Sequence, residues 1–262
     1  MMPSMGSIAT ARGRIGYVEA GSGAATPIIF LHGVGSDKSV WRPQLDHFGK
    51  SRRAVAFDYP GYGESEFAEG ATRDDYAAAI LSALDALGVR KAHICGLSLG
   101  GVIAIAMHAA AAERCASLII ADSFAIHPDG QAIYDRSVAA SQSMTMRQLA
   151  EARTGLLLGS SASPDLRAEV VDTMGAIDPA AYRLGAAAVW LADQRDRAAA
   201  IDVPSLVLVG EEDGITPPEL SEELHRLVPA SKLRRIPAAG HLANIEQPQA
   251  FNSAIQSFLS EL

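Results

Sequence analysis

A serine framed by glycines, Gly96-Leu97-Ser98-Leu99-Gly100, lies between an apolar run and a helical pattern. A serine in such a strand–turn–helix setting exposes its hydroxyl at the helix N-terminus, where the helix dipole stabilises developing negative charge. The turn is tight, so the flanking residues must be small. This setting predicts that Ser98 is a nucleophile for acyl transfer and not an idle serine in a glycine-rich turn.

A nucleophilic serine needs a general base, and the base needs an acid that orients it. Among the seven histidines, His241 follows the predicted strand 232–236 and precedes the last helical pattern. Its loop can therefore lean over the centre of a sheet. His93 lies in the apolar run before Ser98, and His108 lies too far along the following helix to reach back. We predict His241 as the base.

Asp213 is the predicted orienting acid. It follows the apolar run 203–209 and stands between the serine and the histidine, which is the chain order typical of this arrangement. Two glutamates directly before it are placed less well, because Asp213 lies farthest into the loop. Asp122, after the run 117–121, is a rival acid and also a candidate pocket residue, together with Trp190.

A second glycine-rich turn, His32-Gly33-Val34-Gly35, ends the apolar run 26–32. A backbone N–H from such a loop can pair with the N–H of the residue after the nucleophile and hold an oxyanion. We assign these two donors to Val34 and Leu99.

Elements that could position these residues alternate along the chain as short apolar runs and helical patterns. Alternation of this kind predicts an α/β protein with a mostly parallel central sheet flanked by helices. The expected strands are 14–19 (antiparallel, at the sheet edge), 26–32, 53–57, 92–97, 117–121, 203–209 and 232–236, and the expected helices outside the insertion are 73–87, 98–112, 217–228 and one from Pro248.

The alternation stops between residues 124 and 192, where helical patterns such as 147–158 and 166–174 predominate. Ser163-Pro164 and Asp178-Pro179 are each typical of a helix N-cap followed by proline. We predict a core domain made of 1–123 and 193–262, and a helical lid (cap) at 124–192.

The composition argues against several classes of protein: nucleic-acid-binding, disulfide-rich, membrane-spanning and secreted. The 262 residues carry 22 Lys plus Arg against 30 Asp plus Glu, a net charge of −8, so binding to nucleic acid is not expected. Two cysteines cannot form a disulfide scaffold. No apolar run is long enough to span a membrane, and the first fourteen residues lack the apolar core of a signal peptide. We expect a cytoplasmic protein without a membrane contact, and no metal or cofactor, since no ligand cluster has metal-binding spacing.

The motifs together resemble the α/β-hydrolase superfamily over nearly the whole chain. His32-Gly33, the turn 58–65, the segment 96–101, Asp213 and Gly240-His241 occur in the order typical of that superfamily. Within it, the segments 96–101 and 241–248 are similar to 3-oxoadipate enol-lactonases and related carboxylesterases. One position departs from many relatives: Pro60 stands where they carry an arginine.

The resemblance implies a cofactor-free serine hydrolase of a small-molecule ester or lactone. Other activities with the same machinery are a C–C bond hydrolase of vinylogous diketones, a cofactor-free perhydrolase or haloperoxidase, and a hydrolase-like ligand receptor. If the substrate carries a carboxylate, as the enol-lactonase resemblance implies, its partner must replace the missing turn arginine. The predicted lid offers five arginines: Arg136, Arg147, Arg153, Arg167 and Arg183. The oligomeric state and the pathway have no signal in the sequence.

Overall fold

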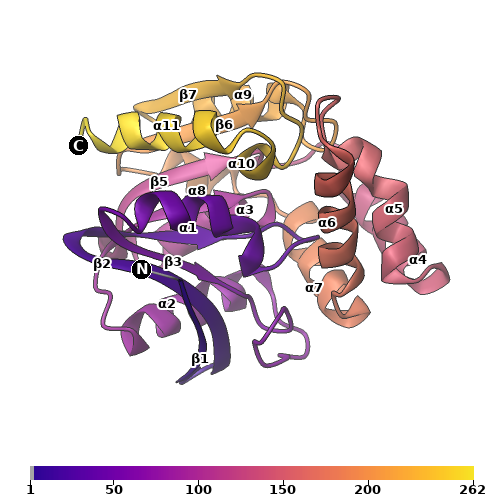
Figure 1. The fold of residues 1–262 in the computed structure, drawn as a ribbon, viewed down its shortest axis with the longest axis horizontal. Helices are drawn as coiled ribbons and strands as arrows, with labels where there is room; N and C mark the ends of the chain where they lie inside the picture. The colour runs from indigo at the N-terminus through magenta and orange to yellow at the C-terminus, as the bar shows by residue number, and fades with distance from the viewer. Residues whose placement is uncertain (1–2) are drawn as a thin grey trace.

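The computed structural model describes residues 3–262 and contains one seven-stranded sheet with helices on both faces (Figure 1). The strands run in the order β1-β2-β4-β5-β6-β7, with β3 paired to β2. Their bounds are β1 Ser4–Thr10, β2 Gly13–Leu31, β3 Arg52–Phe57, β4 Ala92–Leu97, β5 Cys115–Ala121, β6 Ser205–Gly210 and β7 Ser231–Ile236. From β4 to β7 every pairing is parallel, so the predicted mostly parallel sheet is confirmed.

One edge of the sheet differs from the prediction. The expected edge strand 14–19 is the first half of the long strand β2, and the edge position belongs to β1, which pairs with it in antiparallel fashion. The first half of β2 pairs Tyr17 with Phe57, whereas its second half pairs Leu31 with the same residue, so β3 lies between the two halves. Residues of β1 alternate between exposed and half-buried, and such a weak apolar pattern did not predict a strand.

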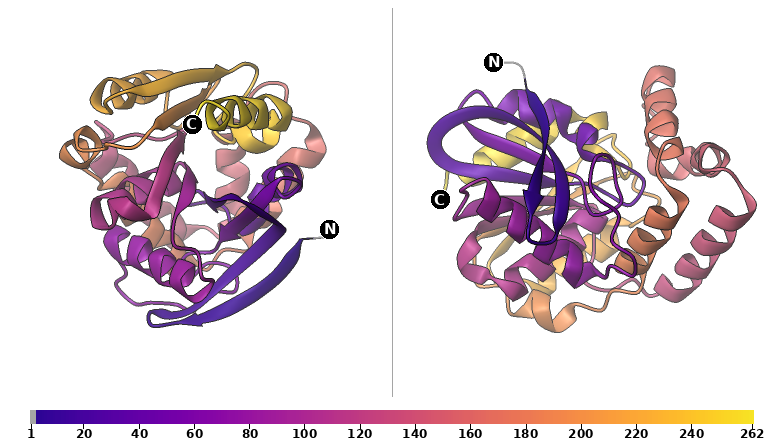
Figure 2. Two further views of the ribbon diagram at one scale, coloured as in Figure 1. Left: turned by 90° about the vertical axis from the view of Figure 1, so that its left-hand side faces the viewer. Right: turned by 90° about the horizontal axis from the view of Figure 1, so that it is seen from below.

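Two sets of helices cover the sheet (Figure 2). Helices α1 and α11 contact each other on one face, and α2, α3, α8 and α9 form a chain of contacts over the other. The helices outside the insertion are α1 Arg42–Phe48, α2 Arg73–Ala86, α3 Leu99–Ala110, α8 Arg195–Ala199, α9 Pro218–Leu227, α10 Ala243–Glu246 and α11 Pro248–Leu259, with short 3₁₀ turns at Lys38–Trp41 and Ala112–Arg114.

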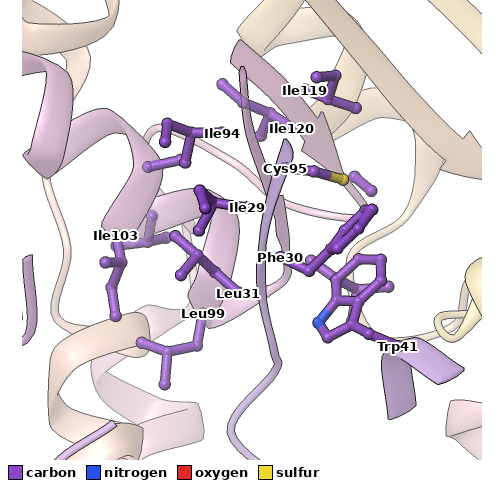
Figure 3. Packing of buried hydrophobic residues seen from close by; sticks show 14 of the residues in the cluster. Ile29, Phe30, Leu31, Trp41, Ile94, Cys95, Leu99, Ile103, Ile119 and Ile120 are labelled. Carbon is purple, nitrogen blue, oxygen red and sulfur yellow. The ribbon is translucent and has the colours of Figure 1, made fainter. Parts of the chain in front are cut away.

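The core lies where the central strands meet α3 and the turn around Trp41 (Figure 3). Residues from β2, β4 and β5 are fully buried there because both sheet faces are covered, which explains their continuous apolar runs. Each fully buried side chain of this kind contributes about 1.5–3 kcal/mol. Rigid central strands therefore support the loops at their carboxyl ends, where the candidate residues lie.

Residues 124–192 contain four helices, α4 Gly130–Ser143, α5 Met146–Leu157, α6 Pro164–Gly175 and α7 Pro179–Trp190. We call this segment the helical insertion. Its helices gather at one side of the molecule, and Figure 2 shows part of them standing apart from the sheet layers. The predicted N-caps are present: the side chain of Ser163 accepts from the Leu166 N–H, and that of Asp178 accepts from two N–H groups of α7. The division into a core domain and a lid stays a prediction, and residues 1–2 of that core domain lie outside the described part.

Candidate active site

Ser98 occupies a strained turn between β4 and α3. Its φ of 57° and ψ of −117° place a non-glycine residue at positive φ, a conformation that costs free energy and is retained mainly at functional sites. Its backbone is held from both sides, because its N–H donates to Ala121 (2.9 Å) and its carbonyl accepts from the Ser123 hydroxyl (2.8 Å). The predicted elbow geometry is present.

Glycines make this turn possible. A Cβ on Gly96 would lie 2.0 Å from the carbonyl oxygen of Gly100, and a Cβ on Gly100 would lie 2.0 Å from that of Leu31. These contacts are with backbone atoms that cannot move aside. The residues around Ser98 must therefore be small because a larger side chain would collide with the backbone.

His241 and Asp213 form a buried pair. The distance from His241 Nδ1 to Asp213 Oδ2 is 2.9 Å, and both residues are almost fully buried. A carboxylate oxygen can only accept, so Nδ1 carries the proton and Nε2 is left as the acceptor. The turn 213–216 fixes the acid: Asp213 Oδ1 accepts from the N–H groups of Ile215 (2.8 Å) and Thr216 (2.9 Å), and Oδ2 accepts from the Thr216 hydroxyl (2.7 Å).

Asp213 is held in its ionised form. Burial by itself raises the pKa of this carboxyl, but the attraction of His241 and the hydrogen bonds from His241 and Thr216 outweigh burial, so the pKa lies below its ordinary value. The role of Thr216 was not predicted. An aspartate followed three residues later by threonine is a signal for such a turn, because a short acid can accept from the backbone two and three residues on.

Asp122 lies beneath the site and not in the pocket. It is completely buried at positive φ after β5, and its Oδ1 accepts from the Gly210 N–H at 2.7 Å. Burial and the nearby charge of Asp213 raise the pKa of Asp122 well above its ordinary value, which favours the protonated carboxyl. The expectation that Asp122 lines the pocket is therefore corrected. A carboxyl group at the end of a strand can be buried below the edge of the sheet or can line a pocket. The fact that a residue follows a strand does not tell these two positions apart.

The loop after β2 approaches the elbow closely. A Cβ on Gly33 would lie 3.4 Å from Ser98 Cβ. The carbonyl of Gly33, which shares a peptide plane with the Val34 N–H, accepts from His32 Nδ1 (2.8 Å) and from the Ser36 N–H (3.2 Å). These bonds fix the direction of the predicted oxyanion donor. The Tyr62 hydroxyl adds a bond to the Val34 carbonyl at 3.2 Å. Sequence reasoning did not assign these supporting roles.

A mostly apolar pocket adjoins Ser98 and His241 and includes the loop 33–36 in its wall. The helical insertion supplies most of the remaining wall, and Trp190 is part of it; its contact with a substrate stays a prediction. The lining residues from the insertion are Arg153, Leu157, Val170, Met174, Tyr182 and Trp190. Ser98, His241 and Val34, which is one of the two predicted oxyanion donors, thus line one cavity.

Other candidates lie away from this chemistry. His93 bonds Ser117 within the core, and burial lowers the pKa of its imidazole to about 4. Cys95 is completely buried, and burial raises the pKa of its thiol, which keeps it protonated. Across residues 3–262, no group of three His, Cys, Asp or Glu residues could hold a metal ion, and no helix is long and apolar enough to cross a membrane.

A family model for the α/β hydrolase fold matches residues 26–248. The chain belongs to the α/β-hydrolase family. A 3-oxoadipate enol-lactonase of Acinetobacter baylyi is 28% identical over 240 residues, which cover 91% of this chain and 90% of that protein. Among solved structures, the enol-lactonase of Burkholderia xenovorans LB400 has a TM-score of 0.91 at 26% identity and covers 97% of this α/β hydrolase and 100% of that chain. A malate-bound thermophilic esterase of Thermogutta terrifontis has a TM-score of 0.90 at 28% identity, with 98% of both chains covered. The chain is thus an enzyme, a hydrolase similar to lactonases and esterases.

Proposed function

We propose that this protein is a serine hydrolase that cleaves a carboxylic ester or lactone through an acyl-enzyme on Ser98. The observation that carries the proposal is the buried 2.9 Å pair of His241 and Asp213, in which His241 lines the same pocket as the strained Ser98. The enol-lactonase and esterase relatives support the choice of substrate class.

The geometry supports a two-step reaction. In the first step His241 Nε2 takes the proton of the Ser98 hydroxyl as its oxygen attacks the carbonyl carbon, and the N–H groups of Val34 and Leu99 hold the oxyanion. His241 then donates its proton to the leaving alkoxide, which leaves as an alcohol, or stays attached through the acyl chain when the substrate is a lactone. In the second step His241 activates water, which releases the acid. Asp213 stabilises the imidazolium in both steps.

A carboxylate on the substrate has one suitable partner among the five arginines of the insertion. Arg147 pairs with Asp172, and Arg167 donates to two backbone carbonyls near the end of α5. Arg153 is half-buried and is the one Lys or Arg in the pocket wall. Within residues 3–262 no acidic side chain pairs with it. Arg153 therefore replaces the turn arginine absent at Pro60 as the proposed contact for an acidic substrate.

Covalent labelling tests the proposal. A fluorophosphonate probe should add one label to the wild-type protein and none to Ser98→Ala. In parallel, p-nitrophenyl esters, simple lactones, a vinylogous diketone and peracid formation are assayed with both proteins. Sustained ester or lactone turnover that is lost by several orders of magnitude in Ser98→Ala supports the proposal. Labelling or turnover that survives Ser98→Ala refutes it. If diketone cleavage, perhydrolysis or single-turnover binding is the only activity found, the proposal of an ester or lactone substrate is wrong.

A further inference from the structure

Glu246, at the end of α10, holds three backbone N–H groups with one carboxylate. Its Oε1 accepts from Gly240 at 2.9 Å and from Leu242 at 3.3 Å, the two residues on either side of His241. Its Oε2 accepts from Gly159 at 2.7 Å, just after helix α5 of the helical insertion. The two oxygens thus bind segments that are eighty residues apart in the chain.

The N–H of His241 itself is bound to the same part of the insertion. It donates to the carbonyl of Leu157, the last residue of α5, at 2.9 Å. All three consecutive N–H groups of the loop 240–242 are therefore held by Glu246 and by α5. Asp213 fixes only the ring nitrogen Nδ1, whereas these bonds fix the backbone from which the ring extends.

The approach of the two segments explains why an anion is needed between them. A Cβ on Gly240 would lie 2.5 Å from the nitrogen of Gly159, and a Cβ on Gly159 would lie 3.0 Å from the nitrogen of Gly240. Two N–H dipoles that converge in this way repel each other unless an acceptor lies between them. A carboxylate offers one oxygen to each segment, and charge-assisted hydrogen bonds are about twice as strong as neutral ones.

We propose that Glu246 is a positioning residue that clamps the His241 loop to the helical insertion, so that the imidazole is aligned only while the segment 157–159 is docked. This inference rests on the proposed function, since it assigns His241 as the base. Leu157 also lines the pocket. Docking of one segment therefore completes the pocket wall and aligns the base together, which ties catalysis to the closed arrangement that excludes water.

Glu212 provides a matched control. Its Oε2 accepts from the Ser160 N–H at 2.7 Å, so it holds the same turn of the insertion, but it makes no bond to the N–H groups of 240–242. Glu212→Gln loosens the insertion alone, whereas Glu246→Gln loosens the insertion and the His241 loop. In Glu246→Gln the NH₂ group of the glutamine replaces one of the two carboxylate oxygens. A backbone N–H that bonds an acceptor in the wild type then faces another donor.

The kinetic test compares the two variants on a small neutral ester. Glu246→Gln should lower kcat about 10–100-fold with little change in KM, since it removes charged hydrogen bonds that act through His241. It should also broaden or remove the low-field proton resonance of the His241–Asp213 hydrogen bond. Glu212→Gln should keep kcat within about fivefold, the range of one exposed charged contact, and keep the resonance. Equal losses in both variants, or an unchanged kcat or resonance in Glu246→Gln, would overturn the proposal.

Amide exchange on the wild-type protein tests the clamp even if Glu246→Gln does not fold. After division by their intrinsic exchange rates, the N–H groups of Gly159, Gly240 and Leu242 should show one common protection factor, and phosphonylation of the enzyme should raise all three together. A protection factor for Gly159 that differs from those of the other two amides, or that responds differently, would contradict a shared clamp. A failure of the proposed function appears separately, as labelling or turnover that survives Ser98→Ala, and the exchange rates would still decide whether the two segments are coupled.

Discussion

Exchanging the buried carboxyl groups of Asp213 and Asp122 for amides, one at a time, tests whether Asp213 is the orienting acid, as proposed, and Asp122 is not. In Asp213→Asn, the amide oxygen can keep the two N–H groups of the turn, but the NH₂ group faces His241 Nδ1, 2.9 Å from the replaced oxygen. That NH₂ can only donate, so the imidazole proton moves to Nε2, which can then no longer accept the proton of Ser98. Catalysis is lost although the packing is kept. The expected decrease in kcat is about 10⁴-fold, the value known for a serine protease triad, or about 5.5 kcal/mol of transition-state stabilisation.

The same substitution at Asp122 should do far less. The raised pKa of Asp122 favours its neutral form, and an amide has nearly the same shape, keeps an oxygen for the Gly210 N–H and carries no charge. We expect kcat to change by less than about tenfold, because no bond to His241 is involved. Initial rates with a p-nitrophenyl ester for both variants provide the measurement, with circular dichroism to verify folding. A larger loss in Asp122→Asn than in Asp213→Asn would refute the assignment, and similar losses would show that the two acids share the role.

The pH dependence of the free energy of unfolding provides a second test of Asp122, because it reports the pKa of this carboxyl in the folded protein. Its pKa in the folded protein lies above the unfolded value of about 3.9, so the folded state binds more protons, and this group lowers the free energy of unfolding as pH rises above that value. Asp122→Asn removes the dependence. The free energy of unfolding of the variant, measured by urea unfolding, should therefore increase relative to that of the wild type as the pH rises above about 4. A difference that stays constant with pH would show that the pKa of Asp122 is not raised in the folded protein.

Further changes test the pocket, the fold and the absence of a cofactor. Arg153→Met should lower kcat/KM for an ester with a free carboxylate about 10–100-fold and spare its neutral counterpart, whereas Arg147→Met should affect neither; an unchanged ratio in Arg153→Met would remove the proposed contact. In Lys38→Met the completely buried Asp58 loses the ion pair between its Oδ2 and Lys38 Nζ, which are 2.6 Å apart, and the free energy of unfolding should fall by about 3–5 kcal/mol. A loss below about 1 kcal/mol would contradict a buried ion pair. Gly96→Ala should yield no folded protein because its Cβ meets a carbonyl oxygen; Gly155→Ala, where no atom lies within 4 Å of the new Cβ, is the control and should fold normally. Dialysis against EDTA should leave activity intact, and a loss restored by zinc or manganese would contradict a metal-free mechanism.

Local sequence patterns predicted the parts of the fold that depend on local physics. Continuous apolar runs marked β4 and β5 because both faces of those strands are covered, and Ser163 and Asp178 marked helix starts because capping needs only a few consecutive residues. The strand β1 was missed because its residues are mostly exposed, so its place depends on pairing with β2 and not on its own apolar pattern. The path of β2 on both sides of β3 likewise depends on contacts that no short window contains.

The candidate site shows the same division. The meeting of Ser98, Asp213 and His241 could be predicted because each follows a strand, and parallel strands bring their carboxyl ends to one edge of the sheet; their catalytic roles stay a proposal. The place of Asp122 beneath that edge could not, because burial of a side chain by neighbouring loops is a property of the assembled fold. Thr216 lies between these cases: its spacing from Asp213 is a local signal, but only the fold brings its hydroxyl within 3.2 Å of the imidazole.

If the proposed function holds, the attachment of the helical insertion lets one chain combine fixed catalytic residues with a pocket whose lining can vary. The side chains of α5 and α7 that line the pocket can change without altering the backbone carbonyl of Leu157, which accepts from the His241 N–H, or the N–H of Gly159, which donates to Glu246. Backbone groups persist through most substitutions, and Glu246 contributes its side chain from the core and not from the insertion. If the proposed function holds, the side chains that line the pocket are thus separate from the groups through which α5 and Glu246 hold the His241 loop. A change of pocket residue should then alter KM among substrates more than kcat, whereas a shift of the whole end of α5 should alter kcat for every substrate.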